Sequence, residues 1–119
     1  MLKNEDVDLT KCEQRYDYLF VKDFCKGITL ILNSEESGIY NLSSNNSLQL
    51  KEILLMIKDI TNSKSNLNFG ALDYRKDQVM YMEGDSTKFY KTFDFDPDFD
   101  LKNSLSKTLS FYKNHFNNN

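Results

Sequence analysis

The segment from residue 50 to residue 60 constrains the fold of this chain most strongly. Apolar side chains recur there every three or four positions, at Leu50, Ile53, Leu54, Ile57 and Ile60. This spacing predicts an amphipathic α-helix with charged side chains on its opposite face. Such a helix becomes stable mainly by packing its apolar face against another element, so the rest of the chain must supply a second layer.

Short runs of aromatic and β-branched residues are the candidate strands for that layer. They span Val7–Thr10, Tyr18–Val21, Gly38–Leu42 and Asn66–Leu72. The run Gly38–Leu42 is apolar on both sides, which is typical of a buried strand in a parallel sheet. Because strands and helices alternate along the chain, the sequence predicts an α/β fold.

Further helices are predicted between and after these strands. Asp23 should cap a helix whose apolar positions are Phe24, Ile28, Ile31 and Leu32. A helix of one to two turns is expected at Asp85–Lys91, and a last helix carries one stripe formed by Leu101, Leu105, Leu109, Tyr112 and Phe116. A length of 119 residues fits one domain, so residues 1–119 are expected to form a single domain with a frayed tail at 117–119.

The composition excludes several classes of protein. The chain has 15 Lys and Arg side chains against 18 Asp and Glu, and this net charge of -3 argues against a dedicated nucleic-acid-binding protein. The longest apolar run, Ile53–Ile57, is too short to span a bilayer, and the first residues carry no apolar signal core. We therefore expect a cytoplasmic protein with no membrane segment, in which Cys12 and Cys25 stay reduced.

The order of several short motifs resembles a known family. A Tyr-Asp-Tyr-Leu-Phe-Val-Lys-Asp segment ends at Asp23, and an Asn-Phe-Gly-Ala-Leu-Asp-Tyr-Arg segment ends at Arg75. Gly-Ile-Tyr-Asn-Leu-Ser-Ser begins at Gly38, Asp-Ser-Thr-Lys begins at Asp85, and Phe-Asp-Pro begins at Phe95. Over nearly the whole chain, these segments resemble the carboxy-terminal part of the NAD-dependent epimerase/dehydratase family, the extended short-chain dehydrogenase/reductases that modify nucleotide-sugars.

The resemblance implies a partial, substrate-binding domain that lacks most of the Rossmann cofactor half. It also implies that the complete enzyme uses NAD(P) to epimerise, dehydrate or reduce a nucleotide-diphosphate sugar. This chain would bind the nucleotide diphosphate, would hold no cofactor of its own and would be inactive alone.

Two arginines are implied as substrate-binding residues. Arg75 matches an arginine whose motif contacts the diphosphate in the family, and its planar guanidinium can donate two parallel hydrogen bonds to phosphate oxygens. Arg15 lies one residue before the position, here Tyr16, where many relatives place an arginine. Because neighbours in a strand face opposite sides, a shift of one residue leaves open whether Arg15 points toward the ligand.

No catalytic, cofactor-binding or metal-binding residue is assigned to this chain. Tyr18 and Lys22 match the Tyr-x-x-x-Lys pattern of the family's catalytic pair, but that pair needs helical spacing and these residues flank a predicted strand. The four glycines lie too far apart for a dinucleotide-binding turn. The alternating aspartates of Asp94–Asp100 lack the glycine and glutamate of a calcium loop, so an acidic turn before the last helix is expected.

Two alternatives remain open. The chain could be a non-catalytic binding or interaction module that pairs with a separate cofactor-binding chain or with a second copy of itself. The Gly38–Leu42 segment motivates this alternative, because without a cofactor half its apolar surface would be exposed, and exposed apolar patches drive association. The chain could also be a truncated product without activity.

Overall fold

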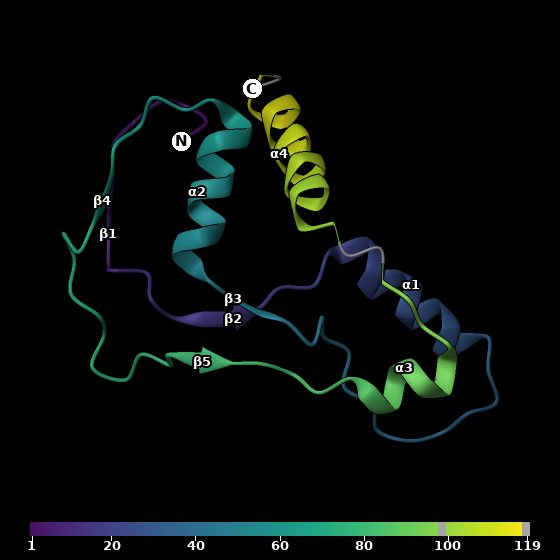
Figure 1. The fold of residues 1–119 in the computed structure, drawn as a ribbon. Helices are drawn as coiled ribbons and strands as arrows, with labels where there is room; N and C mark the ends of the chain where they lie inside the picture. The colour runs from purple at the N-terminus through teal and green to yellow at the C-terminus, as the bar shows by residue number, and fades with distance from the viewer. Residues whose placement is uncertain (98–99, 118–119) are drawn as a thin grey trace. The chain divides into compact units, whose positions relative to one another are not determined.

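A computed structural model describes residues 1–97 and 100–117 of this chain (Figure 1). Its helices and strands are, in chain order, β1 (Val7–Leu9), β2 (Arg15–Asp17), α1 (Val21–Leu32), β3 (Ser47–Gln49), α2 (Leu50–Thr61), β4 (Leu67–Phe69), β5 (Tyr81–Met82), α3 (Thr87–Phe93) and α4 (Leu101–Asn117). They divide between two compact units. The first unit holds residues 1–14, 49–80 and the described residues from 100 onward, and the second holds residues 15–48 and the described part of 81–99.

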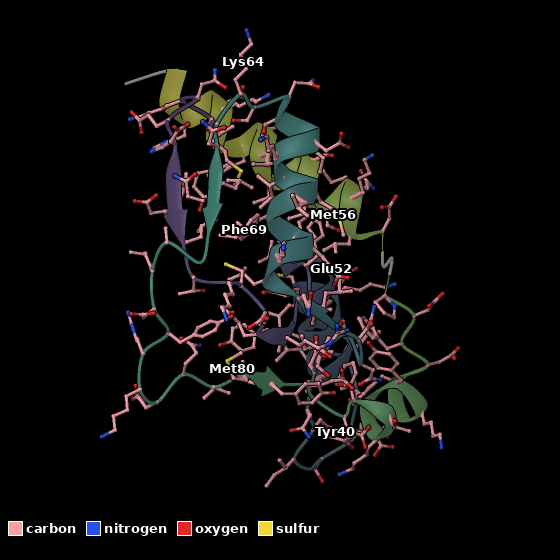
Figure 2. The ribbon with its side chains drawn as sticks, turned by 60° about the vertical axis from the view of Figure 1, so that its left-hand side comes forward. Tyr40, Glu52, Met56, Lys64, Phe69 and Met80 are labelled. Carbon is pink, nitrogen blue, oxygen red and sulfur yellow. The ribbon has the colours of Figure 1, made fainter. Side chains whose placement is uncertain are left out.

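In the first unit, two strands and two helices pack together. Strands β1 and β4 pair in parallel, with Val7 opposite Leu67 and Leu9 opposite Phe69. Helix α4 lies along α2, and Figure 2 shows the side chain of Phe69 on the α2 side of β4. The ammonium group of Lys51, on the first turn of α2, lies 4.9 Å from the centre of the Phe69 ring.

Helix α2 begins and ends at defined signals. Gln49 and Glu52 form a capping box, in which the Glu52 carboxylate accepts a hydrogen bond of 3.0 Å from the backbone N–H of Gln49. The backbone N–H groups of Leu50 and Lys51 donate to the carbonyls of Gln14 and Cys12, so the first turn has partners outside the helix. Asn62, in the left-handed conformation at φ 50°, ends the helix.

In the second unit, a small sheet, α1 and α3 surround an aromatic core. The sheet has the order β3-β2-β5, and β2 pairs in parallel with β5, Arg15 opposite Tyr81. Phe89 is fully buried, and its ring packs edge-on or tilted against the rings of Tyr40, Phe93 and Phe95. Such aromatic pairs add stability beyond the area that they bury.

Much of the predicted element order is confirmed. The chain is α/β, and the amphipathic segment at residues 50–60 forms α2. Strands β1 and β4 lie within two of the predicted strand segments. The strand pairs β1–β4 and β2–β5 are both parallel, although the parallel strand predicted at Gly38–Leu42 does not form. The short helix and the last helix form as α3 and α4. Asp98 and Phe99 of the predicted acidic turn, and Asn118 and Asn119 of the predicted frayed tail, lie outside the described residues.

Three predictions in the second unit are wrong. The strand predicted at Tyr18–Val21 forms earlier, as β2, because that segment pairs with β5. Helix α1 begins after Phe20, whose backbone is extended, so Asp23 lies within the first turn and is buried instead of capping the helix. Gly38–Leu42 forms no strand, since the described residues offer it no neighbouring strand to pair with.

Within the described residues, no helix combines the length and the apolar character needed to cross a membrane.

Candidate functional site

Arg75 lies on the loop that follows β4 in the first unit. Gly70 ends the strand with a positive φ of 83°, a conformation that favours glycine, and the N–H groups of Gly70 and Leu72 both donate to the carbonyl of Leu9. Farther along, the Tyr74 hydroxyl accepts a hydrogen bond of 2.8 Å from the N–H of Glu13. The residue directly before Arg75 is thus held to a segment more than 60 positions away in the sequence.

The Arg75 guanidinium is exposed on this loop. In the part of the chain that the structure describes, it makes no hydrogen bond and no ion pair, while the Arg75 carbonyl accepts from the N–H of Gln78 in a turn. Lys76 follows as a second exposed cation, and Asp73 and Asp77 flank the pair. The N–H donors of the Arg75 guanidinium are therefore open to solvent, while hydrogen bonds of its neighbours Tyr74 and Gln78 hold the loop in place.

Arg15 has a different environment in the second unit. It is half-buried on β2, and its Nη2 donates a hydrogen bond of 2.6 Å to the carbonyl of Ser47 on the neighbouring strand β3. The backbone N–H of Ser47 in turn donates to the carboxylate of Glu83, at 2.9 Å. Hydrogen bonds from Ser47, then one from Tyr81 and the charge of Arg15, hold the pKa of Glu83 below its usual range.

The two predicted arginines belong to different units of the chain: Arg75 lies in the first and Arg15 in the second. Ser47 and Glu83, which surround Arg15, were not predicted from the sequence. The signal for them is weak, because Ser47 ends a Ser-Ser-Asn-Asn-Ser run that is typical of any turn and Glu83 is one of many acidic residues.

A polar junction joins the loop at residues 43–46 to the segment before α3. The Ser43 N–H donates to the hydroxyl of Ser86 at 2.6 Å, the Ser86 N–H donates to the Asn45 side chain at 2.7 Å, and the Tyr90 hydroxyl donates to the Ser43 carbonyl at 2.7 Å. The Asp17 carboxylate accepts from the N–H of Ser44 at 2.7 Å. Burial and the charges of Asp17 and other nearby aspartates raise the pKa of Tyr90.

The residues rejected as catalytic do not lie on a common helix. Tyr18 precedes α1 and Lys22 lies in its first turn, so the interval between them is not helical, although it forms a loop where a strand was predicted. Among the described residues, no group of three or more His, Cys, Asp or Glu side chains could hold a metal ion. Cys12 is buried and Cys25 is exposed on α1, and both thiols are free.

The glycines of this chain do not form a dinucleotide cradle. Gly27 lies inside α1, Gly38 and Gly70 lie in loops with positive φ, and Gly84 lies before α3. NAD(P) binding of the Rossmann type needs a glycine-rich turn between a strand and the N-terminus of a helix. The glycines of the described residues do not form such a turn, so no NAD(P)-binding role is assigned to them.

No family model matches the sequence. A curated relative, CDP-abequose synthase of Salmonella muenchen, is 30% identical over 113 residues, which cover 92% of this chain and 38% of the relative. Among solved structures, UDP-glucose 4-epimerase of Thermotoga maritima, determined with UDP-glucose, has a TM-score of 0.87 at 20% identity over 98% of this chain and 37% of the epimerase. The dTDP-glucose 4,6-dehydratase of Bacillus anthracis, determined with NAD, has a TM-score of 0.78 at 19% identity over 95% of this chain and 36% of the dehydratase.

The three matches cover nearly all of this chain and a similar share of each relative. The chain spans little more than a third of the length of each relative, and the low identity to the solved structures makes them relatives in fold. The sequence match to a nucleotide-sugar enzyme and the fold match to epimerases and dehydratases point to the same proteins. The chain therefore matches a carboxy-terminal fragment of the NAD-dependent epimerases and dehydratases, in sequence over 38% of CDP-abequose synthase and in fold over about a third of the solved enzymes.

Proposed function

We propose that this chain forms the substrate-binding part of an NAD(P)-dependent nucleotide-sugar epimerase, dehydratase or reductase, and that Arg75 binds the diphosphate of the substrate. The observation that carries this proposal is the exposed Arg75 guanidinium, whose loop is held by the hydrogen bond between Tyr74 and Glu13. A guanidinium can donate two parallel hydrogen bonds to phosphate oxygens. In this role the chain alone binds a nucleotide-sugar and does not turn it over.

Arg15 is proposed as a second substrate contact. One of its N–H groups donates to the Ser47 carbonyl, and a guanidinium carries five N–H donors, so further donors are available for a phosphate oxygen. The Glu83 carboxylate on the other side of Ser47 carries a negative charge that disfavours a phosphate at this place. Arg75 is therefore the first of the two residues to test.

An equilibrium titration of the chain with UDP-, CDP- and dTDP-sugars tests the role of Arg75. A charge-assisted hydrogen bond contributes about 1.5–3 kcal/mol, so Arg75→Ala should weaken binding by about 10-fold to 150-fold. Arg75→Lys should fall between Arg75→Ala and the unaltered chain, since an ammonium keeps the charge and loses the bidentate geometry.

Lys76→Ala is the matched control, because it removes the neighbouring exposed cation from the same loop. The proposal expects Lys76→Ala to bind nearly as tightly as the unaltered chain. Equal losses in Arg75→Ala and Lys76→Ala would mean that the loop attracts anions only through its overall charge. Unchanged binding in Arg75→Ala would remove Arg75 from the site.

A further inference from the structure

Tyr74 links the exposed loop of Arg75 to a segment 61 positions earlier in the chain. Its hydroxyl accepts a hydrogen bond of 2.8 Å from the backbone N–H of Glu13 and lies 3.5 Å from the Glu13 carboxylate. A phenol hydroxyl can accept and donate at once, so one group contacts both the backbone and the side chain of Glu13. Tyr74 is half-buried, whereas its neighbours Asp73 and Arg75 are exposed.

The segment that carries Glu13 is itself held by α2. The residues on either side of Glu13, Cys12 and Gln14, are buried. Their carbonyls accept hydrogen bonds of 3.0 and 2.9 Å from the N–H groups of Lys51 and Leu50, in the first turn of α2. Glu13 is exposed between them. The position of its N–H, the partner of the Tyr74 hydroxyl, is therefore set by contacts with a helix.

Arg75 directly follows Tyr74, so the link to Glu13 also limits where its guanidinium can lie. After Arg75 the chain turns, and the N–H of Gln78 donates to the Arg75 carbonyl at 3.1 Å. A binding group that is ordered before it meets a ligand loses less conformational entropy on binding. A chain without the Tyr74 hydroxyl would keep the guanidinium and its charge, but it would have to order the loop when it binds.

We propose that Tyr74 is a positioning residue of the diphosphate site, and that its hydrogen bond with the Glu13 N–H holds Arg75 where the guanidinium meets the phosphate oxygens. This inference rests on the proposed function of Arg75 and adds a residue that acts through Arg75 without touching the ligand. All of these residues lie in the first unit. The effect of Tyr74 should be smaller than that of Arg75, since a neutral hydrogen bond contributes less than a charge-assisted one.

Calorimetric titrations with UDP, CDP and dTDP test the inference in a double-mutant cycle. Tyr74→Phe removes the hydroxyl and keeps the ring, and it should weaken binding of the tightest of the three ligands about three-fold to ten-fold. In the Arg75→Ala background the same change should alter binding by less than about two-fold, because no guanidinium remains to be positioned. Glu13→Gln is the matched control: it keeps the backbone N–H that Tyr74 bonds, so it should not weaken binding.

Amide hydrogen exchange reports on the link itself, without any ligand. The Glu13 amide should exchange faster in Tyr74→Phe than in the unaltered chain, because its acceptor is gone. The circular dichroism spectrum of Tyr74→Phe should match that of the unaltered chain, which separates positioning from a loss of fold. Equal exchange at Glu13 in the two chains would show that the hydrogen bond does not form, and would overturn the inference.

The titrations distinguish failure of this inference from failure of the proposed function. A loss of affinity in Arg75→Ala with none in Tyr74→Phe would reject Tyr74 and leave the role of Arg75 standing. An equal loss from Tyr74→Phe with and without Arg75 would also reject the inference, because Tyr74 would then contact the ligand or support the fold. Unchanged binding in Arg75→Ala, or no binding of any of the three ligands, would contradict the proposed function, and the inference would fail with it.

Discussion

At the scale of single residues, the contact between Ser43 and Gly84 depends on the absence of a side chain. A Cβ atom at Gly84 would lie 2.6 Å from Ser43 Oγ and 2.7 Å from Ser43 Cβ. Ser43 cannot withdraw easily, because its N–H and hydroxyl both bond to the buried hydroxyl of Ser86. The loop at residues 43–46 is thus held against the segment before α3 by small residues.

Gly84→Ala should therefore destabilise the chain. Overpacking of this kind costs about 1–3 kcal/mol, and the loss should appear in the free energy of unfolding measured with urea. Ser43→Gly in the Gly84→Ala background should recover part of that loss, since it removes both atoms that collide. If Gly84→Ala melts like the unaltered chain, Ser43 and Gly84 are not in contact.

The residue scale also shows what the sequence can predict about the site. The motif predicts a substrate contact for Arg75, and the structure shows only that this side chain is exposed on a loop. The sequence did not predict the partners of Arg15. Ser47 lies 32 positions away along the chain and Glu83 lies farther still, so folding alone brings them near Arg15. Local patterns carry no information about such distant hydrogen bonds.

At the scale of elements, helices α1 and α2 show why the predictions differ in success. Helix α2 carries its own start and stop signals and packs within its unit, so its pattern was sufficient. The apolar positions of α1 predicted a helix correctly, but Phe24, Ile28 and Leu32 are exposed, which the pattern alone could not reveal. A periodic sequence predicts that a face will be buried without saying which molecule buries it.

The stability of the folded chain should depend on pH, because several carboxylates accept hydrogen bonds that protonation would weaken. Asp6, Glu83 and Asp85 each have a lowered pKa because they accept hydrogen bonds, from Asn66, Ser47 and Thr87 respectively. A carboxyl group whose pKa is lower in the folded than in the unfolded state contributes stability above its unfolded pKa, and this contribution is lost as the pH falls through the folded value. Stability should be nearly constant from about pH 6 to pH 8 and decline below about pH 4.

Urea unfolding at several pH values measures this dependence. Glu83→Gln should flatten the decline at acid pH, because the glutamine cannot be protonated in this range. Glu35→Gln serves as the control, since Glu35 is exposed and makes no hydrogen bond or ion pair in the described part of the chain. Identical acid profiles for Glu83→Gln and the unaltered chain would show that the Ser47–Glu83 bond does not form in solution.

At the scale of the whole molecule, the chain is an α/β polypeptide of two compact units that matches about a third of a nucleotide-sugar enzyme. The fold class and the resemblance to nucleotide-sugar epimerases and dehydratases were predictable because the order of the motifs extends along nearly the whole sequence. The absence of a strand at residues 38–42 was not predictable, because a strand needs neighbours that a local pattern does not specify. The two units and the exposed apolar side chains of α1 follow from contacts between residues far apart in the sequence, which a local pattern does not specify.

Calorimetric titration of the unaltered chain with UDP-, CDP- and dTDP-sugars tests the central claim most directly. The account predicts saturable binding of at least one nucleotide-diphosphate sugar, with the corresponding nucleoside monophosphate binding more weakly because it lacks the second phosphate. Binding should also raise the melting temperature, since a ligand that binds only the folded state stabilises it. A folded chain that gives no binding heat with any of these ligands, or that binds monophosphates equally well, would contradict the account.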